Sequence, residues 1–338
     1  METIKKYKLA LVGATGVVGR IVRNVLEEKD LPISKYKFFS SKKSAGSKIV
    51  FDGKEYEVQE LTDNSFDEQF DYAIFTAGSK VSEHFIPIAV KKGCTVIDNS
   101  SFYRMYDDVP LVVPEVNIEE VWKNKGIIAN PNCSTIQAVV AINPLDKKYR
   151  TKRIVYSTYQ AVSGAGLQGI QDLEGGIESY VGNSKYELKK FPYQIFNNCI
   201  PQIDDFTGDG YTKEEHKMIN ETRKILNKPN LPITATTVRV PVFNSHSESI
   251  NIELEKEFNI EDIVNLLKNS PGIIVMDDIS NNIYPMNINA NNHDEVFVGR
   301  IRRDYSVKNG INMWVVADNT RKGAASNAVQ ILKKIIAI

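Results

Sequence analysis

Cys133 lies in a sequence context that favours a reactive thiolate. It belongs to residues 130–137, which follow a predicted buried strand at 126–129 and open into an apolar helix predicted at 134–145. The first N–H groups of a helix are not bonded within it. Together with the helix dipole they stabilise negative charge on a sulfur placed there. A thiolate attacks carbonyl carbon, so the sequence predicts a covalent acyl intermediate on Cys133.

His246 and Arg239 are the side chains that could serve such a thiolate. Arg239 lies near the end of a predicted strand, residues 233–240, and His246 leads into the next one, residues 248–254. Two adjoining strands can bring both side chains to one pocket. A histidine can take the thiol proton and exchange a proton with substrate, typically worth about 10²–10⁴ in rate, and an arginine offers a planar fork for a carboxylate. The alternative is that His246 has no catalytic role, and its position alone leaves this open.

The N-terminal residues predict a dinucleotide-binding unit. A predicted strand at residues 7–12 is followed by the turn Gly13-Ala14-Thr15-Gly16-Val17-Val18-Gly19 and by a helix that ends near Glu28. Glycines in such a turn let the backbone approach a pyrophosphate, which binds at the helix N-terminus. The spacing is GxxGxxG rather than GxGxxG, so a tight turn without ligand is the alternative. The position of the turn directly after the first strand favours the nucleotide.

The loop after the second predicted strand, residues 35–40, indicates which nicotinamide cofactor binds. An NAD-selective fold often has an acidic residue there for the ribose 2′-hydroxyl, whereas this chain has Ser40-Ser41-Lys42-Lys43-Ser44-Ala45-Gly46. Hydroxyl and cationic groups suit a 2′-phosphate, so the sequence predicts NADP. The alternative is a solvated loop with ordinary lysines.

The order of predicted strands and helices divides the chain into two parts. Before Cys133 they alternate, which favours a parallel, doubly wound sheet, with further strands predicted at residues 72–76, 95–98, 111–113 and 126–129 and a helix at 81–92. After Cys133 long strands predominate, which favours a mixed, largely antiparallel sheet. Those strands are predicted at residues 153–160, 233–240, 248–254, 273–276, 295–302 and 312–316, with helices at 212–226 and 259–269.

We therefore expect an α/β protein with a Rossmann-type NADP-binding domain, residues 1–132, and an α+β catalytic domain, residues 133–318. The final amphipathic helix, residues 321–338, is expected to pack back on the first domain, so that residues 319–338 complete it and Asn319 comes near the cofactor. Arg104, in a polar loop after a predicted strand, could bind a phosphate or be an ordinary surface arginine. Residues 185–210 are predicted to be irregular, as a loop or a partner-facing arm.

Composition excludes several classes of function. Lysine plus arginine equals aspartate plus glutamate, 42 each, so no basic field attracts nucleic acid or an anionic membrane. No signal peptide is expected, and no apolar run reaches the ~20 residues that span a bilayer. Cys94, Cys133 and Cys199 are far apart, without CxxC spacing. This suits a reducing cytoplasm and indicates no metal site.

Residues 130–135, Asn-Pro-Asn-Cys-Ser-Thr, resemble the nucleophile motif of the bacterial-type aspartate-semialdehyde dehydrogenases. The likeness covers essentially the whole chain in the same order, and eight further tracts in sequence make it highly specific. The others include the turn at Gly13, Lys43-Ser44-Ala45-Gly46, Asn99-Ser100-Ser101, Val112-Val113-Pro114-Glu115-Val116-Asn117, Tyr159-Gln160-Ala161-Val162-Ser163-Gly164, Glu214-Glu215-His216-Lys217-Met218, Arg239-Val240-Pro241-Val242 and Asp318-Asn319-Thr320-Arg321-Lys322-Gly323-Ala324-Ala325.

The resemblance implies reductive dephosphorylation of L-aspartyl 4-phosphate to aspartate semialdehyde through a Cys133 thioester, with NADPH as reductant. It places the enzyme in the biosynthesis of lysine, through diaminopimelate, and of threonine and methionine. It also implies a homodimer formed through the second domain. By this resemblance His246 is the acid/base, and Gln160 orients the acyl intermediate.

The same resemblance implies two sets of binding residues. Arg239 binds the substrate carboxylate, Glu215 its ammonium group, and Arg104 and Lys217 the departing phosphate, with Asn132 and Gln160 also at the substrate. The NADP site is implied to contain Gly13, Thr15, Gly16, Val17, Val18, Ser41, Lys43, Ser44, Ser163, Gly164 and Asn319. Relatives usually have arginine where Lys43 stands, and lysine lacks the flat fork that grips phosphate in two places.

Three other functions compete with this one. Another phosphorylating aldehyde dehydrogenase, such as glyceraldehyde-3-phosphate dehydrogenase or N-acetyl-glutamyl-phosphate reductase, shares the architecture, but residues 132–137 and Glu215 argue against both. A redox-sensing NADP-binding module would need no histidine or anion sites. A cysteine hydrolase would leave the dinucleotide turn unexplained.

Overall fold

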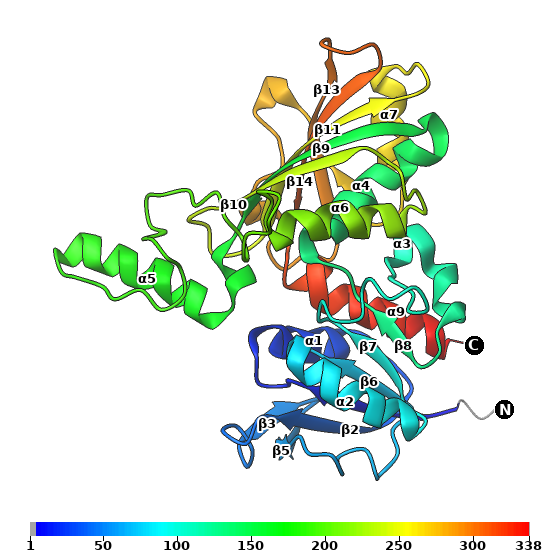
Figure 1. Cartoon of the computed structure of the whole chain (residues 1–338), viewed down its shortest axis with the longest axis vertical. Helices are drawn as coiled ribbons and strands as arrows, with labels where there is room; N and C mark the ends of the chain where they lie inside the picture. Colours follow the sequence, from blue (N-terminus) through cyan, green and yellow to red (C-terminus); the bar gives the residue numbers. More distant parts are fainter. Residues whose placement is uncertain (1–4, 338) are drawn as a thin grey trace. The chain divides into compact units, whose positions relative to one another are not determined.

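The structure is a computed structural model that describes residues 5–337. It contains two compact units (Figure 1): unit 1 comprises Met1–Asn132 with Ala324–Ile338, and unit 2 comprises Cys133–Gly323. We expected residues 319–338 to join the first domain, whereas the residues that cluster with unit 1 begin at Ala324. Asn319 stays in unit 2 because its side-chain oxygen accepts the backbone N–H of Ser245 at 2.9 Å.

Unit 1 contains a six-stranded parallel sheet, which confirms the predicted fold class. The strand order is β5-β2-β1-β6-β7-β8, and every neighbouring pair is parallel. The strands are β1 (Tyr7–Val12), β2 (Ile33–Ser40), β5 (Gln59–Glu60), β6 (Tyr72–Phe75), β7 (Thr95–Asp98) and β8 (Ile127–Ala129); β3 (Lys48–Phe51) and β4 (Lys54–Glu57) form a hairpin. The helices are α1 (Val17–Glu28), α2 (Ser79–Lys91), α3 (Pro114–Asn117), η1 (Ile118–Lys123) and α9 (Ser326–Ile336).

The C-terminal helix α9 packs into unit 1 because its apolar face completes the core. Val329 and Leu332 of α9 are buried in the same cluster as Leu9 of β1 and Val22 of α1. The amphipathic pattern of this helix predicted such packing. Immediately before it, Arg321–Ala325 form a π-helical turn, η4.

The strand predicted at residues 111–113 does not form. Leu111 makes only an isolated bridge to Ala129. The N–H of Val113 donates instead to Asn117 Oδ1 at 2.9 Å, across the short helix α3. Pro114 at the first turn of α3 has a fixed φ compatible with helix, so this apolar triplet leads into a helix rather than a ladder.

Unit 2 contains a mixed sheet with the order β10-β9-β11-β14-β13-β12, again as predicted. The pairs β9–β10 and β12–β13 are parallel and the three central pairs are antiparallel. The strands are β9 (Thr151–Gln160), β10 (Ile233–Arg239), β11 (His246–Leu254), β12 (Ile273–Val275), β13 (Val296–Asp304) and β14 (Gly310–Ala317). Helices α4 (Cys133–Tyr149), α6 (Lys213–Ile225) and α7 (Ile260–Lys268) contact the sheet; shorter helices are η2 (Val162–Ala165), η3 (Ile279–Asn281) and α8 (Asn287–Ala290).

Alternation along the strands brings the candidate site residues to the face that α4 and α6 cover. On β11, Glu248, Ile250 and Ile252 are fully buried, whereas the alternate residues Ser249 and Asn251 are partly exposed; His246 lies on the same face as Glu248 and is also fully buried. The period of two along a strand explains this difference. The register pairs Ser247 of β11 with Tyr159 of β9, and β10 lies on the other side of β9. The ends of β9 and β10 and the start of β11 therefore meet at one edge of the sheet.

Helix α5 (Leu167–Gly182) was not predicted, and in Figure 1 it projects away from the sheet of unit 2. Its glycines, Gly169, Gly175 and Gly176, weaken the helical signal because glycine is a poor helix former. The chain from residue 183 to 212 contains no helix and only isolated bridges at Ile200 and Phe206, so this part is irregular as predicted.

Candidate active site

Cys133 is the first residue of α4, a helix of 17 residues, and it is partly exposed. The helix begins one residue earlier than predicted, so the sulfur lies in the first turn, where helix N–H groups favour a thiolate. Gly323 packs directly against it: a Cβ at Gly323 would lie 2.7 Å from Cys133 Cβ and 3.2 Å from its Cα. Only glycine fits beside the thiol here.

His246 is the first residue of β11 and is completely buried. Its Nδ1 accepts the backbone N–H of Ala161 at 3.0 Å. Because Nδ1 is an acceptor, the neutral ring carries its proton on Nε2. Burial, and secondarily the charge of Arg239, hold the pKa of His246 well below its usual value, so the ring is neutral at physiological pH. The preceding residue, Ser245, has a left-handed backbone with φ of 69°, a strained conformation for a residue other than glycine.

Arg239, at the end of β10, lies beside the same turn. Its Nη1 donates to the carbonyl oxygen of Ala161 at 2.6 Å, so the two backbone groups of Ala161 bond Arg239 and His246 respectively. A Cβ on Gly164 would lie 2.9 Å from Arg239 Nη1 and 3.3 Å from His246 Nε2. Burial lowers the pKa of the Arg239 guanidinium, and the charges of Glu214 and Cys133 raise it in part. The structure thus brings Gly164, Arg239 and His246 together.

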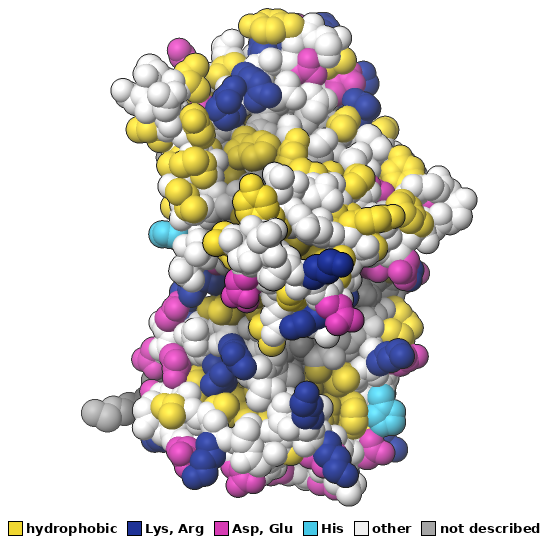
Figure 2. Space-filling view, turned by 90° about the vertical axis from the view of Figure 1, so that its left-hand side faces the viewer, with side chains coloured by type: hydrophobic (Ala, Val, Ile, Leu, Met, Phe, Trp, Pro, Cys, Tyr) yellow, Lys and Arg dark blue, Asp and Glu magenta, His cyan; other side chains and the backbone are white. Residues whose placement is uncertain are grey.

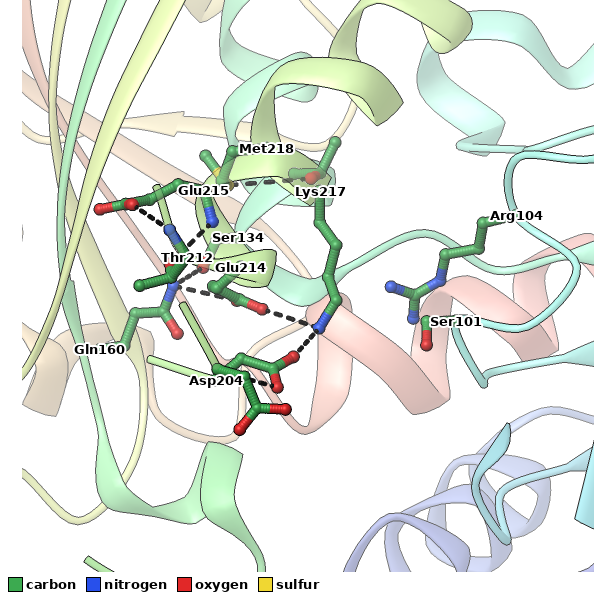
Figure 3. A network of polar contacts seen from close by, with 12 residues as sticks. Ser101, Arg104, Ser134, Gln160, Asp204, Thr212, Glu214, Glu215, Lys217 and Met218 are labelled. Atoms are coloured by element: carbon green, nitrogen blue, oxygen red, sulfur yellow. Dashed lines mark hydrogen bonds and ion pairs between the residues drawn. The ribbon is translucent and has the colours of Figure 1, made fainter. Parts of the chain in front are cut away.

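Gln160, Glu214 and Lys217 form a second polar group, which is bonded to Ser134, the residue after Cys133 (Figure 3). The Nε2 of Gln160 donates to Ser134 Oγ at 2.8 Å and to Glu214 Oε1 at 3.2 Å. Lys217 Nζ lies 3.3 Å from Glu214 Oε2 and 2.7 Å from Asp204 Oδ2. Since Ser134 follows Cys133, these contacts place an amide, a carboxylate and an ammonium group beside the thiol-bearing turn.

The structure contradicts the role predicted for Glu215. Its side chain belongs to a capping box: Oε2 accepts the N–H of Thr212 at 2.7 Å, while Thr212 Oγ1 caps the N–H of Glu215. Its Oε1 accepts the N–H of Thr237 at 3.0 Å. Both carboxylate oxygens therefore bond buried backbone groups, and Glu215 has a structural role. The sequence held the signal for this, because Thr-x-x-Glu before a helix is the capping-box pattern.

Glu214 is the carboxylate that the sequence reasoning missed. It is 5% exposed, and its oxygens contact Gln160 and Lys217. Its charge also acts on Arg239. A carboxylate next to these polar side chains is of the type that binds a cationic group of a ligand.

Ser163 and Asn319 contact one another in unit 2. Ser163 Oγ lies 3.0 Å from Asn319 Nδ2, and Asn319 Oδ1 accepts the N–H of Ser245. Buried Asp318 accepts Asn244 Nδ2 at 2.9 Å and the N–H of Thr320 at 2.8 Å, so it ties the turn before His246 to residues 318–320. Two predicted cofactor residues therefore share a network with the backbone that presents His246.

Arg104 is a buried residue of unit 1 rather than an ordinary surface arginine; it is 7% exposed. Its Nε donates to the carbonyl oxygen of Asn130 at 2.9 Å, and its Nη2 to that of Asn99 at 2.9 Å. Asn130 Nδ2 also donates to Asn99 Oδ1, and Asn130 Oδ1 accepts from Asn327 of α9 at 2.7 Å. These contacts hold the turn that leads to Asn132, which is buried, and then to Cys133.

The glycine turn of unit 1 has the geometry of a phosphate cradle. Gly13 has φ of 86°, and a Cβ there would lie 2.6 Å from Thr76 Oγ1. A Cβ on Gly19 would lie 2.1 Å from the Gly13 carbonyl oxygen. Among the described residues no side chain caps the N-terminus of α1 at Gly16, so its N–H groups suit an anionic ligand. Thr15 Oγ1 lies 2.7 Å from Ser40 Oγ, which joins the turn to the end of β2.

The predicted ribose loop follows β2 as a series of turns. The N–H of Ser44 donates to the carbonyl oxygen of Ser41 at 2.9 Å. Ser41 and Lys43 are exposed and Ser44 is partly exposed. Hydroxyl and ammonium groups in such a loop can meet a phosphate from solvent, so the residues fit a nucleotide with a 2′-phosphate.

Two kinds of feature are absent from residues 5–337. No group of three or more His, Cys, Asp or Glu is arranged to hold a metal ion. No helix there is both long and apolar enough to cross a bilayer.

Comparison with known proteins defines the class. Residues 8–124 match the family model of the semialdehyde dehydrogenase NAD binding domain, and residues 142–322 match that of the semialdehyde dehydrogenase dimerisation domain. The protein, which has a parallel sheet in unit 1 and a cysteine thiol at the start of helix α4 in unit 2, is therefore a semialdehyde dehydrogenase. This class is an oxidoreductase with a nicotinamide cofactor.

Full-length relatives narrow the class to one family. The chain is 53% identical over 334 residues to the aspartate-semialdehyde dehydrogenase of Aquifex aeolicus, covering 98% of each, and 47% identical over 335 residues to that of Bacillus subtilis, covering 97% and 96%. A crystal structure of aspartate semialdehyde dehydrogenase II from Vibrio cholerae, complexed with ASA, matches with a TM-score of 0.95 at 43% identity, covering 98% and 99%. The chain belongs to the aspartate-semialdehyde dehydrogenase family.

Proposed function

We propose that this chain catalyses NADPH-dependent reductive dephosphorylation of L-aspartyl 4-phosphate to L-aspartate 4-semialdehyde through a thioester on Cys133. The observation that carries the proposal is the placement of Cys133 at the N-terminus of α4, with Ser134 bonded to the Gln160–Glu214–Lys217 group. An acyl phosphate with a zwitterionic amino-acid end needs a nucleophile, two cationic sites and one carboxylate. Cys133, Arg239, Lys217 and Glu214 supply those types.

The thiolate of Cys133 attacks the acyl carbon, and the carbonyl oxygen becomes negative. Because Ala161 N–H occupies Nδ1, His246 presents an N–H at Nε2 and donates it to this oxygen. Phosphate takes up one proton as it leaves, and the thioester remains. NADPH, when bound, supplies the hydride that reduces it. The second tetrahedral oxyanion is stabilised by the same donor, and its collapse releases the aldehyde and returns the thiolate.

This scheme gives His246 a narrower role than the acid/base role that the resemblance implied. A thiolate enters the cycle and a thiolate leaves it, so the sulfur needs no proton from the imidazole; the one proton that the reductive direction consumes goes to the departing phosphate. A neutral ring with a fixed tautomer is a hydrogen-bond donor that costs no reorganisation at the moment of reaction. The N-terminus of α4 and the charge of Arg239 keep the sulfur ionised between turnovers.

Substrate recognition follows from charge. Arg239 binds the α-carboxylate through its planar fork, and Glu214 binds the ammonium group in place of Glu215. Lys217 and Arg104 hold the phosphate, and Asn132 and Gln160 orient the acyl group. Each buried charge that the site presents meets an opposite charge of the substrate, which compensates its loss of hydration.

The finer cofactor assignment is NADP. The turn Gly13, Thr15, Gly16, Val17 and Val18 holds the pyrophosphate at the N-terminus of α1. The supporting observation is the cradle that a Cβ at Gly13 or Gly19 would fill. The 2′-phosphate binds Ser41, Lys43 and Ser44, and the nicotinamide end lies against Ser163, Gly164 and Asn319. A solved aspartate semialdehyde dehydrogenase from Candida albicans carries NADP.

The same proposal covers the oligomeric state, the cellular location and the pathway of the enzyme. Residues 1–132 with 324–338 form the NADP-binding domain, and residues 133–323 serve catalysis and form a homodimer. Tyr159 and Trp314, whose rings lie 5.3 Å apart, are exposed or partly exposed on the sheet of unit 2. Figure 2 shows apolar side chains gathered over the part that contains unit 2, where most exposed large apolar residues lie. The enzyme acts in the cytoplasm, in the biosynthesis of lysine, threonine and methionine.

Phosphate-dependent reduction of NADP by aspartate semialdehyde tests the proposal in the reverse direction. We expect activity that requires phosphate and disappears in Cys133→Ala, and an aspartyl adduct on Cys133 when phosphate is omitted. Activity that is independent of phosphate would reject the acyl-phosphate route. Full activity in Cys133→Ala would reject the thioester.

A further inference from the structure

Asp172 of α5 is a buried carboxylate that the reaction above does not use. It is completely buried. Its Oδ1 accepts the N–H of Lys189 at 2.8 Å and the hydroxyl of Tyr186 at 3.2 Å; its Oδ2 accepts the N–H of Lys190 at 2.8 Å and of Phe191 at 2.9 Å. Hydrogen bonds to an ionised acceptor are about twice as strong as neutral ones. Asp172 therefore clamps residues 186–191 onto α5.

The clamp is charged at neutral pH. Burial alone would raise the pKa of Asp172. The hydrogen bonds from Phe191, Lys189, Lys190 and Tyr186 lower it by more than burial raises it, so the pKa lies below its usual value. An ionised carboxylate accepts at both oxygens, as this arrangement requires.

Glycines in α5 fit the clamped segment closely. A Cβ on Gly175 would lie 2.1 Å from the ring of Tyr186, and one on Gly176 would lie 2.8 Å from Phe196 Cβ. Adjacent glycines inside a helix cost about 1 kcal/mol each relative to alanine. The close approach of segment and helix explains why small residues occur there.

The irregular chain after α5 contacts Arg239 in two ways, through Phe191 of the clamped segment and through Ile200 beyond it. The ring of Phe191 lies 5.9 Å from Arg239 Cζ. Ile200 exchanges two backbone hydrogen bonds with Arg239, at 2.9 and 2.8 Å. Ile200 also packs in one apolar cluster with Leu173 of α5 and Val162. Val162 follows Ala161, whose carbonyl oxygen accepts Arg239 Nη1.

We propose that Asp172 is a positioning residue for substrate: by clamping residues 186–191 onto α5, it sets the guanidinium of Arg239 in the orientation that receives the substrate carboxylate. This inference rests on the role proposed above for Arg239. A bidentate guanidinium–carboxylate pair depends on orientation, and a misplacement of about 1 Å can cost about 10²-fold in rate. Residues 183–200, which the sequence left without a role, thus act on specificity.

The test compares Asp172→Asn with the wild-type full-length enzyme. Asparagine keeps one acceptor and places an NH₂ group against backbone N–H donors. We expect faster hydrogen–deuterium exchange in residues 183–200. We also expect the KM for aspartate semialdehyde to rise about tenfold, with the KM for NADP unchanged and kcat within about threefold. A merely structural role would not separate the two KM values.

Two further variants keep the test decisive. Phe191→Leu retains an apolar side chain but removes the ring face, and its substrate KM should rise by about two- to tenfold. Asp278→Asn is the matched control. Asp278 also accepts side-chain and backbone donors in a turn of unit 2, from Ser280 and Asn281. We expect its substrate KM to stay at the wild-type value.

The outcomes separate this inference from the proposed function. Faster exchange in Asp172→Asn with an unchanged substrate KM would overturn the positioning role, and so would unchanged exchange. Arg239→Ala is measured in parallel. If it leaves the substrate KM unchanged, the assignment of Arg239 fails, and the positioning role fails with it. If Arg239→Ala raises that KM and neither Asp172→Asn nor Phe191→Leu does, only the positioning role is lost.

Discussion

Two adjacent glutamates, Glu214 and Glu215, should separate function from stability. Both are buried, at 5% and 8% exposure, but their carboxylates have different partners. The carboxylate of Glu215 accepts hydrogen bonds from the backbone N–H groups of Thr212 and Thr237. The carboxylate of Glu214 contacts the side chains of Gln160 and Lys217. The isosteric changes Glu214→Gln and Glu215→Gln should therefore produce opposite effects.

Glu215→Gln should destabilise the protein without affecting substrate binding. The amide keeps one acceptor and turns an NH₂ group towards a buried N–H, which costs about 1–3 kcal/mol. Loss of a negative charge in the first turn of α6 adds about 0.3–1 kcal/mol. We expect the free energy of unfolding to fall by about 2–3 kcal/mol, with the substrate KM within about twofold of wild type.

Glu214→Gln should have the reverse effect. The amide oxygen can still accept from Gln160, and the lost ion pair involves Lys217, which is 25% exposed, so the stability change stays within about 1 kcal/mol. Loss of the charge that meets the substrate ammonium group costs about 2 kcal/mol or more of binding. The substrate KM should rise by about 30-fold or more.

Steady-state kinetics and urea unfolding on the two purified variants measure both effects. The KM for aspartate semialdehyde is determined at saturating NADP and phosphate, and the free energy of unfolding comes from the urea transition. The reassignment fails if Glu215→Gln raises the KM as much as Glu214→Gln does. It also fails if Glu214→Gln is the less stable variant and its KM is that of wild type.

Three more perturbations test other parts of the structure. Gly323→Ala places a methyl group 2.7 Å from Cys133 Cβ and should lower kcat more than about tenfold, whereas Gly208→Ala, with nothing within 4 Å, should not; equal kcat values would contradict the packing. Burial, and secondarily Glu214, raise the pKa of Glu248 well above 4.5, so the folded state keeps a proton that the unfolded state loses above that pH, and this residue's contribution to stability falls as pH rises. In urea unfolding, the free energy of unfolding of Glu248→Gln relative to that of wild type should increase from pH 5 to pH 8, by up to about 1.4 kcal/mol per pH unit. A difference that does not change with pH would refute this. Lys43→Glu should raise the KM for NADP far more than that for NAD, and equal increases would remove Lys43 from the 2′-phosphate site.

Local signals in the sequence were sufficient to predict most helices, strands and turns. The glycine turn and the Thr212 cap depend on neighbours within one helical turn, and they form where expected. The amphipathic final helix also forms, but its α-helical part begins at Ser326, after the π-helical turn Arg321–Ala325, rather than at Arg321. Helix α5 was missed because its glycines are explained only by Tyr186 and Phe196, which pack against it. The apolar run at residues 111–113 was misassigned because apolar content alone does not distinguish a strand from the approach to a helix.

The sequence by itself determined the family, the thiol at a helix start and the division into a parallel and a mixed sheet, because motif order and periodicity are local properties of the chain. Only the tertiary structure decided that both carboxylate oxygens of Glu215 are occupied by backbone groups and which nitrogen of His246 carries the proton. Those answers depend on Thr237 and Ala161, residues distant in sequence whose backbone N–H groups are brought into contact by the sheet. A buried N–H must find an acceptor, and where the fold places that donor decides what the side chain is free to do.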